Sequence, residues 1–128
     1  MDYSLIIPIF NEKNTLEKLL FQLKNFDKKL EIIIINDGST DGTKSILEAQ
    51  NDFFVLHNKS NKGKGYSIIK GVNSCSRKNI ILMDGDLEIE LASISRLVEE
   101  HEKYKNTVVI GSRWNHRRRS DFNINTYG

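Results

Sequence analysis

Three acidic residues alternate along one short stretch of the chain, directly after an apolar run. Asp84, Asp86 and Glu88 follow the segment 79–83. Alternate side chains of an extended chain point the same way, so these carboxylates can converge on one spot. Like charges repel unless a cation lies between them, and hard divalent cations such as Mg²⁺ and Mn²⁺ prefer oxygen ligands. The stretch is a candidate metal site, whereas an isolated Asp-x-Asp is usually a turn or a solvated loop.

Apolar segments elsewhere predict the elements that position this stretch. Short β-branched runs predict strands, and apolar residues at helical spacing predict helices. The expected strands are 3–10, 30–35, 53–57, 79–83 and 108–110. The expected helices begin near Asn14, Lys44, Tyr66 and Leu91, and the third of them should pack through Tyr66, Ile69, Val72 and Cys75.

The alternation of strands and helices indicates an α/β fold. Strands without a polar alternation are typical of a parallel sheet that helices cover on both faces. Ligands of such sheets bind at the carboxyl ends of the strands. The loops at that edge should be 10–12, 36–42, 61–65, 84–88 and 111–113, which carry nearly all the unusual chemistry of the sequence.

Length and composition describe one soluble globular domain of 128 residues, with a net charge of +2 that implies no general affinity for nucleic acid. The basic residues Arg113 and 117–119 make the C-terminal end locally cationic. The only cysteine, Cys75, excludes an internal disulfide and fits a reducing cytosol. No apolar run approaches the roughly 20 residues that cross a bilayer. We therefore expect a cytoplasmic protein, or a cytoplasmic piece of a larger one.

Five motifs follow one another in the order known from one enzyme family. They are Ile-Pro-Ile-Phe-Asn-Glu at 7–12, Ile-Asn-Asp-Gly-Ser-Thr-Asp-Gly-Thr at 35–43, Asn-Lys-Gly-Lys-Gly at 61–65, Met-Asp-Gly-Asp-Leu-Glu at 83–88 and Ile-Gly-Ser-Arg at 110–113. Together they resemble the family 2 inverting glycosyltransferases of GT-A fold, particularly the dolichyl- or polyprenyl-phosphate sugar synthases. The chain differs in having Asn36 where aspartate is usual, Gly85 where alanine is usual, and no proline in 87–91.

The resemblance implies a GT-A fold, a Rossmann-like and mostly parallel sheet with helices on both faces. The whole chain, 1–128, would be a single nucleotide-sugar-binding domain. The family continues with an acceptor-binding half beyond its Gly-Ser-Arg motif, whereas this chain stops shortly after 111–113. We therefore expect a fold that is truncated after the fifth strand.

By the same resemblance, Pro8, Phe10 and Glu12 border the nucleoside, and Asp37 receives the base. A carboxylate can accept a hydrogen bond from the ring N–H of uracil or guanine. Taken without the other motifs, the loop 36–42 would be interpreted as a helix-capping turn.

The resemblance places Lys62, Lys64 and Asp84 near the diphosphate, on a glycine loop that permits close approach. A solvated basic turn is an equally good interpretation of the two lysines. Asp84, Asp86 and Glu88 would hold Mg²⁺ or Mn²⁺, and Asp86 and Arg113 would be catalytic residues. Arg113, with the arginines at 117–119, could bind an acceptor phosphate or anionic lipid. A solvated terminus is at least as good an interpretation of the last three.

The implied reaction transfers a hexose, with inversion, from a UDP- or GDP-sugar to a polyprenyl phosphate or a glycan. A phosphate acceptor with a pKa of about 6 needs no general base, because it is already ionised at neutral pH. Implied partners are the donor, the acceptor, the cytoplasmic face of a membrane and a second copy of the chain; nucleic acid is excluded.

Two alternatives stay open. One is a non-catalytic or truncated nucleotide-sugar-binding domain. The other, a sugar-1-phosphate nucleotidyltransferase, would normally have a glycine-rich basic loop in place of 10–12.

Overall fold

The chain folds as two compact units, Met1–Ile89 and Glu90–Gly128. A computed structural model describes residues 2–26, 29–86, 91–104, 108–112 and 123–127. Glu88, Arg113 and the arginines at 117–119 therefore lie outside the described residues.

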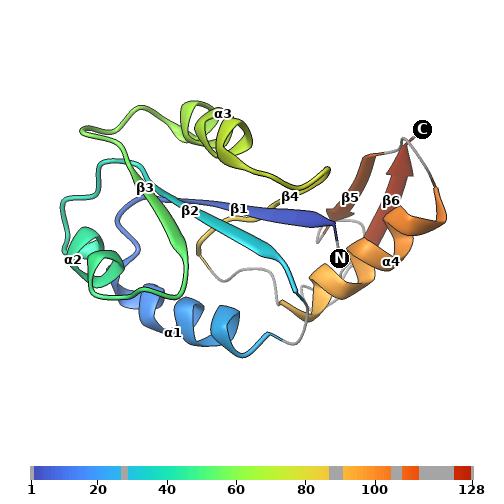
Figure 1. The fold of residues 1–128 in the computed structure, drawn as a ribbon, viewed down its shortest axis with the longest axis horizontal. Coiled ribbons are helices and arrows are strands. Elements are labelled where there is room, and N and C mark those ends of the chain that lie inside the picture. Colours follow the sequence, from blue (N-terminus) through green and yellow to red (C-terminus); the bar gives the residue numbers. More distant parts are fainter. Residues whose placement is uncertain (1, 27–28, 87–90, 105–107, 113–122, 128) are drawn as a thin grey trace. The chain divides into compact units, whose positions relative to one another are not determined.

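A parallel sheet forms the centre of the first unit. Its four strands lie in the order β3-β2-β1-β4 (Figure 1). They are β1 (Tyr3–Ile9), β2 (Glu31–Asn36), β3 (Phe54–His57) and β4 (Asn79–Leu82). The central strand β1 is buried along nearly its whole length. Burial on both faces explains why its sequence is apolar from Leu5 to Ile9.

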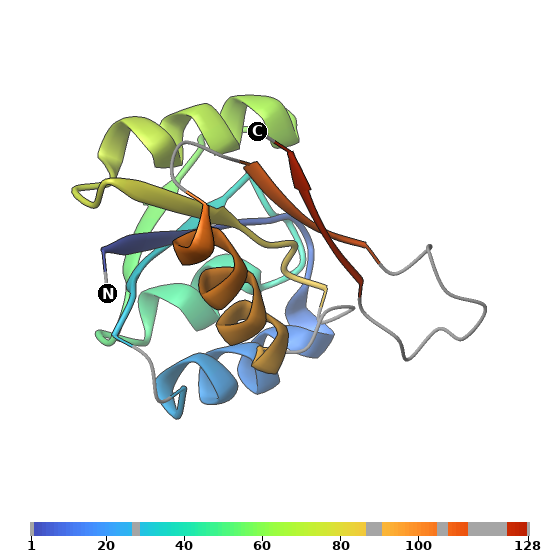
Figure 2. The same cartoon turned by 90° about the vertical axis from the view of Figure 1, so that its right-hand side faces the viewer.

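Helices cover both faces of this sheet. α1 (Lys13–Lys24) and α2 (Thr43–Glu48) lie on one face, and α3 (Lys64–Ser74) lies on the other (Figures 1 and 2). α1 buries Leu16, Leu19 and Leu23, which recur at helical spacing. The predicted α/β fold with a mostly parallel sheet is confirmed. Within the described residues, no helix is both long and apolar enough to cross a lipid bilayer.

α3 packs on the sheet through small residues, so the predicted inner face of this helix is wrong for Tyr66, Ile69 and Val72, whereas Cys75 at its end packs against the core as expected. The side chains of Tyr66, Ile69 and Val72 are 52%, 63% and 36% exposed. Ser67 and Gly71 are buried instead. The apolar stripe of α3 therefore points away from the sheet that it covers.

Gly71 allows this close packing because it has no side chain. A Cβ atom at this position would lie 2.7 Å from Ile6 Cγ2 and 2.8 Å from Ile35 Cδ1. Both isoleucines are fully buried in the core. Any larger residue at 71 would have to push the helix away from β1 and β2.

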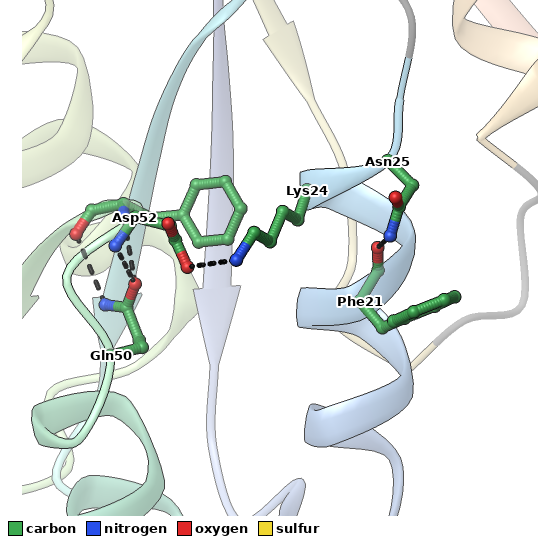
Figure 3. A network of polar contacts seen from close by, with 6 residues as sticks. Phe21, Lys24, Asn25, Gln50 and Asp52 are labelled. Carbon is green, nitrogen blue, oxygen red and sulfur yellow. Dashed lines mark hydrogen bonds and ion pairs between the residues drawn. The ribbon is translucent and has the colours of Figure 1, made fainter.

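Gln50 holds the turn between α2 and β3 (Figure 3). Its Oε1 accepts the N–H groups of Asp52 at 2.8 Å and Phe53 at 2.9 Å. Its Nε2 donates to the carbonyls of Leu47 at 3.2 Å and Phe53 at 3.3 Å. Lys24 of α1 pairs with Asp52 at 3.5 Å, which ties the turn to α1. These contacts brace the amino end of β3.

Glu31 joins three segments at the amino ends of the strands. Its Oε1 accepts Ser4 Oγ at 2.6 Å and the N–H of Ser76 at 2.7 Å, and its Oε2 accepts Ser76 Oγ. The bond from Ser4, followed by those from Ser76, lowers the pKa of Glu31 to about 2. The ionised carboxylate therefore links β2 to β1 and to the segment before β4.

The second unit contains α4 (Ala92–Lys103) and the strands β5 (Val108–Ser112) and β6 (Asn123–Tyr127). The strands form an antiparallel ladder in which Val108 lies opposite Tyr127. α4 contacts both of them. The helix and β5 agree with the expected elements, whereas β6 was not expected, because its asparagines and threonine interrupt the apolar pattern.

Two glycines of α3 test the packing at Gly71. We expect Gly71→Ala to lower the free energy of unfolding by about 1–2 kcal/mol, because overpacking outweighs the gain in helix propensity. Gly65→Ala is the matched control, since a Cβ at Gly65 would contact nothing within 4 Å. Urea denaturation of both variants measures the difference. Equal stability of the two variants would contradict the close packing of α3 on β1 and β2.

Glu31 should make stability depend on pH. Because its native pKa of about 2 lies below the ordinary 4.5, the unfolded state takes up a proton first as pH falls. Stability from this group is present above pH 4.5 and is lost between 4.5 and 2. We expect Glu31→Gln to lose less stability than the wild type between neutral pH and the lower end of this window, as measured by urea midpoints. A pH dependence as steep as that of the wild type would contradict this role.

Candidate functional site

Loops at the carboxyl ends of the four parallel strands line an open cavity of about 380 Å³. Parallel strands end at one edge of their sheet, and this brings together residues that are distant in sequence. The cavity is lined by Pro8, Phe10, Glu12, Asp37, Asn61, Gly63, Lys64, Asp84, Gly85 and Asp86. All of these except Asn61, Gly63 and Gly85 are site residues predicted from the sequence.

Three predicted residues are not among those that line the cavity. Lys62 has an exposed side chain, and it meets the site through its backbone N–H, which donates to Asp37 Oδ1 at 2.7 Å. Glu88 and Arg113 lie outside the described residues. Their proposed roles stay predictions.

Asn11 fastens the loop after β1 to the loop after β2. Its backbone is in the left-handed region, with φ of 50°, which few residue types other than glycine and asparagine adopt. Its N–H donates to Ser39 Oγ at 3.0 Å, and its Oδ1 accepts the N–H of Thr40 at 2.8 Å. The turn in which Asn11 lies separates Phe10 from Glu12, which both line the cavity.

Asp41 makes a second link between these two loops. Its Oδ2 accepts the N–H of Lys13 at 3.1 Å, and its Oδ1 accepts the N–H and the hydroxyl of Thr43 at 3.0 and 2.5 Å. The hydroxyl of Thr43 and the other bonds lower the pKa of Asp41. Most polar side chains of 36–43 thus hold loops together, and Asp37 is the member of this segment that lines the cavity.

Asp37 accepts three hydrogen bonds from the segment after β3. Asn58 Nδ2 donates to its Oδ1 at 2.9 Å, as the N–H of Lys62 does at 2.7 Å, and the N–H of Gly63 donates to its Oδ2 at 2.9 Å. The residue is only 4% exposed. Burial alone would raise the pKa of Asp37, but the hydrogen bonds to the charged form outweigh burial and lower it.

Gly38 lets the two loops meet at this point. Its φ is 69°, and a Cβ atom on it would lie 2.3 Å from the carbonyl carbon of Ser60 and 2.4 Å from the nitrogen of Asn61. Backbone atoms cannot yield as a flexible side chain does. The residue after Asp37 therefore has to be glycine for the segment 58–63 to reach the carboxylate.

Asn58 is a residue of this site that sequence reasoning missed. It is 8% exposed and bonds to Asp37, Ser67 and Lys70. The glycine motif at 61–65 indicated a ligand loop beyond Asn58 and gave no weight to Asn58 itself. A signal was present, because Asn58 is a polar residue directly after the strand β3, at the edge where ligands bind.

The acidic loop after β4 presents two carboxylates to the cavity. Asp84 and Asp86 both line it, with the buried Gly85 between them. The carboxylate of Asp84 pairs with the ammonium of Lys64, and both side chains are at least half exposed. The acidic loop after β4 is thus paired with a cation at the start of α3.

The carboxylates of Asp84 and Asp86 fit a divalent cation that completes its coordination shell with the phosphates of a bound ligand. Among the described residues, no three His, Cys, Asp or Glu side chains are grouped closely enough to hold a metal. Mg²⁺ is usually held by one or two carboxylates together with substrate phosphates, and not by a cage of protein ligands. Asp84 and Asp86 are such a pair, and both could contribute oxygen ligands.

Comparisons with known proteins identify the family of the chain. The model of glycosyl transferase family 2 matches residues 4–127. The undecaprenyl-phosphate 4-deoxy-4-formamido-L-arabinose transferase of Pseudomonas fluorescens is 32% identical over 109 residues, which cover 78% of this chain and 32% of the relative. The chain spans between 30% and 39% of the length of the curated relatives it matches.

Two solved structures have a similar fold. Staphylococcus aureus TarS 1-349 in complex with UDP aligns with a TM-score of 0.63 and 22% identity, over 85% of this chain and 34% of that one. The mannosyltransferase PcManGT from Pyrobaculum calidifontis, in complex with GDP-Man and Mn²⁺, aligns with a TM-score of 0.60 and 22% identity, over 66% and 27%. With the GT-A fold and the family match together, the chain belongs to glycosyl transferase family 2.

Proposed function

We propose that the cavity binds a nucleoside diphosphate sugar with a divalent metal ion, and that the protein transfers the hexose to an acceptor with inversion. The observation that carries this proposal is the convergence of Phe10, Asp37, Lys64 and the Asp84–Asp86 loop on one cavity. It combines an exposed aromatic side chain, a buried carboxylate, a cation and a pair of acidic side chains. These are the parts that such a donor requires.

The nucleoside would occupy the part of the cavity formed by the loops after β1 and β2. Phe10 is 45% exposed and lines the cavity, so its ring is available to contact a base. Pro8 and Glu12 also line the cavity and would border the nucleoside. Asp37 would accept the N–H of uracil or guanine, because its pKa is lowered and the carboxylate is ionised at neutral pH.

The diphosphate would lie toward Lys64, Asp84 and Asp86. A metal ion bound by the two aspartates would act as a Lewis acid on the leaving diphosphate. Lys64 pairs with Asp84. When the diphosphate is bound, the ammonium of Lys64 would contact a phosphate oxygen and neutralise part of its growing charge.

For the acceptor we propose a polyprenyl phosphate. The support is the similarity to an undecaprenyl-phosphate transferase. The second pKa of such a phosphate, about 6, leaves the nucleophilic oxygen ionised at neutral pH, so no general base is needed. Arg113 would pair with this phosphate at the cytoplasmic face of a membrane.

The two alternatives are weaker. A nucleotidyltransferase would need a basic glycine-rich loop after β1, and here that loop places Phe10 and Glu12 in the cavity. A binding domain without turnover shares the donor site, so transfer has to be measured to exclude it.

Asp86 tests the metal site. We expect Mn²⁺ to tighten binding of UDP or GDP by the wild type, and Asp86→Ala to bind at least about tenfold more weakly in Mn²⁺, because a contact between charged groups contributes about 1.5–3 kcal/mol. Titration calorimetry with and without Mn²⁺ measures both effects. Glu17→Ala, an exposed carboxylate on α1, is the control. An unchanged response of Asp86→Ala to Mn²⁺ would remove Asp86 from the metal site.

Transfer of radiolabelled hexose tests the reaction itself. We expect label from UDP-glucose, GDP-mannose or UDP-N-acetylglucosamine to appear on a short polyprenyl phosphate, and the product to have the anomeric configuration opposite to that of the donor. The assay compares this 128-residue chain with a longer chain that continues past Gly128. We expect poor transfer by the shorter chain, since it spans only 30% to 39% of the length of the curated relatives it matches. Donor binding without transfer by either chain would favour the binding-domain alternative.

A further inference from the structure

The polar groups of the Asn58 side chain are all hydrogen-bonded, and the side chain is buried behind the residues that would touch a ligand. It is 8% exposed and is not among the residues that line the cavity. Its Nδ2 donates to Asp37 Oδ1 at 2.9 Å and to Ser67 Oγ at 3.0 Å. Its Oδ1 accepts Lys70 Nζ at 2.9 Å. Both donors of the carboxamide and its acceptor are used.

The carboxamide of Asn58 fits this place in one orientation only. Lys70 has donors and no acceptor, so it has to face the amide oxygen. The ionised Asp37 has acceptors and no donor, so it has to face the NH₂ group. A flipped amide would set oxygen against carboxylate and NH₂ against ammonium. Asn58 therefore bridges a cation on α3 to the anion at the cavity wall.

Asp37 lines the cavity while it is held in this way. Its carboxylate accepts bonds from Asn58, Lys62 and Gly63, and a bond from the Ser67 hydroxyl also lowers its pKa. The bonds from Asn58 and Ser67 come from side chains, so a substitution can remove them without changing the backbone. Asn58 differs from Ser67 in that it also bonds to Lys70.

We propose that Asn58, oriented by Lys70, is a positioning residue that holds the Asp37 carboxylate in the rotamer that receives the nucleobase. This inference rests on the proposed function, because it assigns Asn58 a role only if Asp37 reads the base. Asn58 itself touches no ligand. Its effect on binding has to pass through Asp37.

A double-mutant cycle separates this role from a general effect on folding. We expect Asn58→Ala to weaken binding of UDP or GDP by about tenfold in the wild type, the usual size for a lost hydrogen bond to a charged group. In the Asp37→Ala background the same change should have less than about a twofold effect, since the residue it positions is gone. Calorimetry in Mn²⁺ measures all four proteins. Additive losses would overturn the proposal.

Gln50→Ala is the matched control for stability. Asn58 makes three side-chain hydrogen bonds and Gln50 makes four, but Gln50 is not among the residues that line the cavity. We expect it to lower the urea midpoint as Asn58→Ala does and to leave nucleotide affinity unchanged. A similar loss of affinity in Gln50→Ala would show that stability alone explains the result.

A second readout needs no nucleotide. In Asn58→Ala the carboxyl pKa of Asp37, followed by carbon NMR, should rise, because a hydrogen bond to its charged form is lost. Lys70→Met, which keeps Asn58, should shift the same pKa in the same direction by less. An unchanged pKa in both variants would overturn the positioning role.

The two proposals fail in different ways. If the wild type bound neither UDP nor GDP, the proposed function would be wrong, and this role would fall with it even if the pKa responds. If the wild type bound nucleotide but the cycle was additive, the donor site would stand and only the role of Asn58 would be wrong.

Discussion

The cavity depends on one buried carboxylate that binds a backbone loop. Asp37 follows β2, and its three hydrogen bonds draw the segment 58–63 from the next strand against it. Gly38 makes room for that segment, and α3 begins directly after it at Lys64. Lys64 therefore reaches the acidic loop after β4 because Asp37 has fixed the start of its helix. The buried Asp37 carboxylate thus determines where the Lys64 ammonium lies.

Much of this arrangement could be predicted from the sequence, because parallel strands place their carboxyl ends at one edge. The apolar runs at β1 and β2 indicate burial on both faces, so the loops after them had to meet. This is why Phe10, Asp37, Lys64 and Asp86 could be grouped from the sequence alone. The direction of the strands and the position of the polar residues are enough for that grouping.

What could not be predicted depends on packing between elements. α3 has an apolar stripe at helical spacing, yet the core accepts Ser67 and Gly71, because Ile6 and Ile35 already fill the space beneath the helix. The bonds of Asn58 join three segments, and no local pattern reports such a contact. β6 has no regular alternation of polar and apolar residues, and it is a strand because β5 pairs with it. Propensity alone is a weak guide there.

The left-handed turn at Asn11 limits which sequences this loop can have. Glycine would adopt its φ of 50° readily but would lose the side-chain oxygen that accepts the N–H of Thr40. Aspartate would keep an acceptor and add a negative charge beside a cavity that already holds Asp37 and Glu12. A β-branched residue would fit neither the backbone nor the hydrogen bond. In a library randomised at position 11, the variants that still fold should carry asparagine, glycine or aspartate, with asparagine the most frequent.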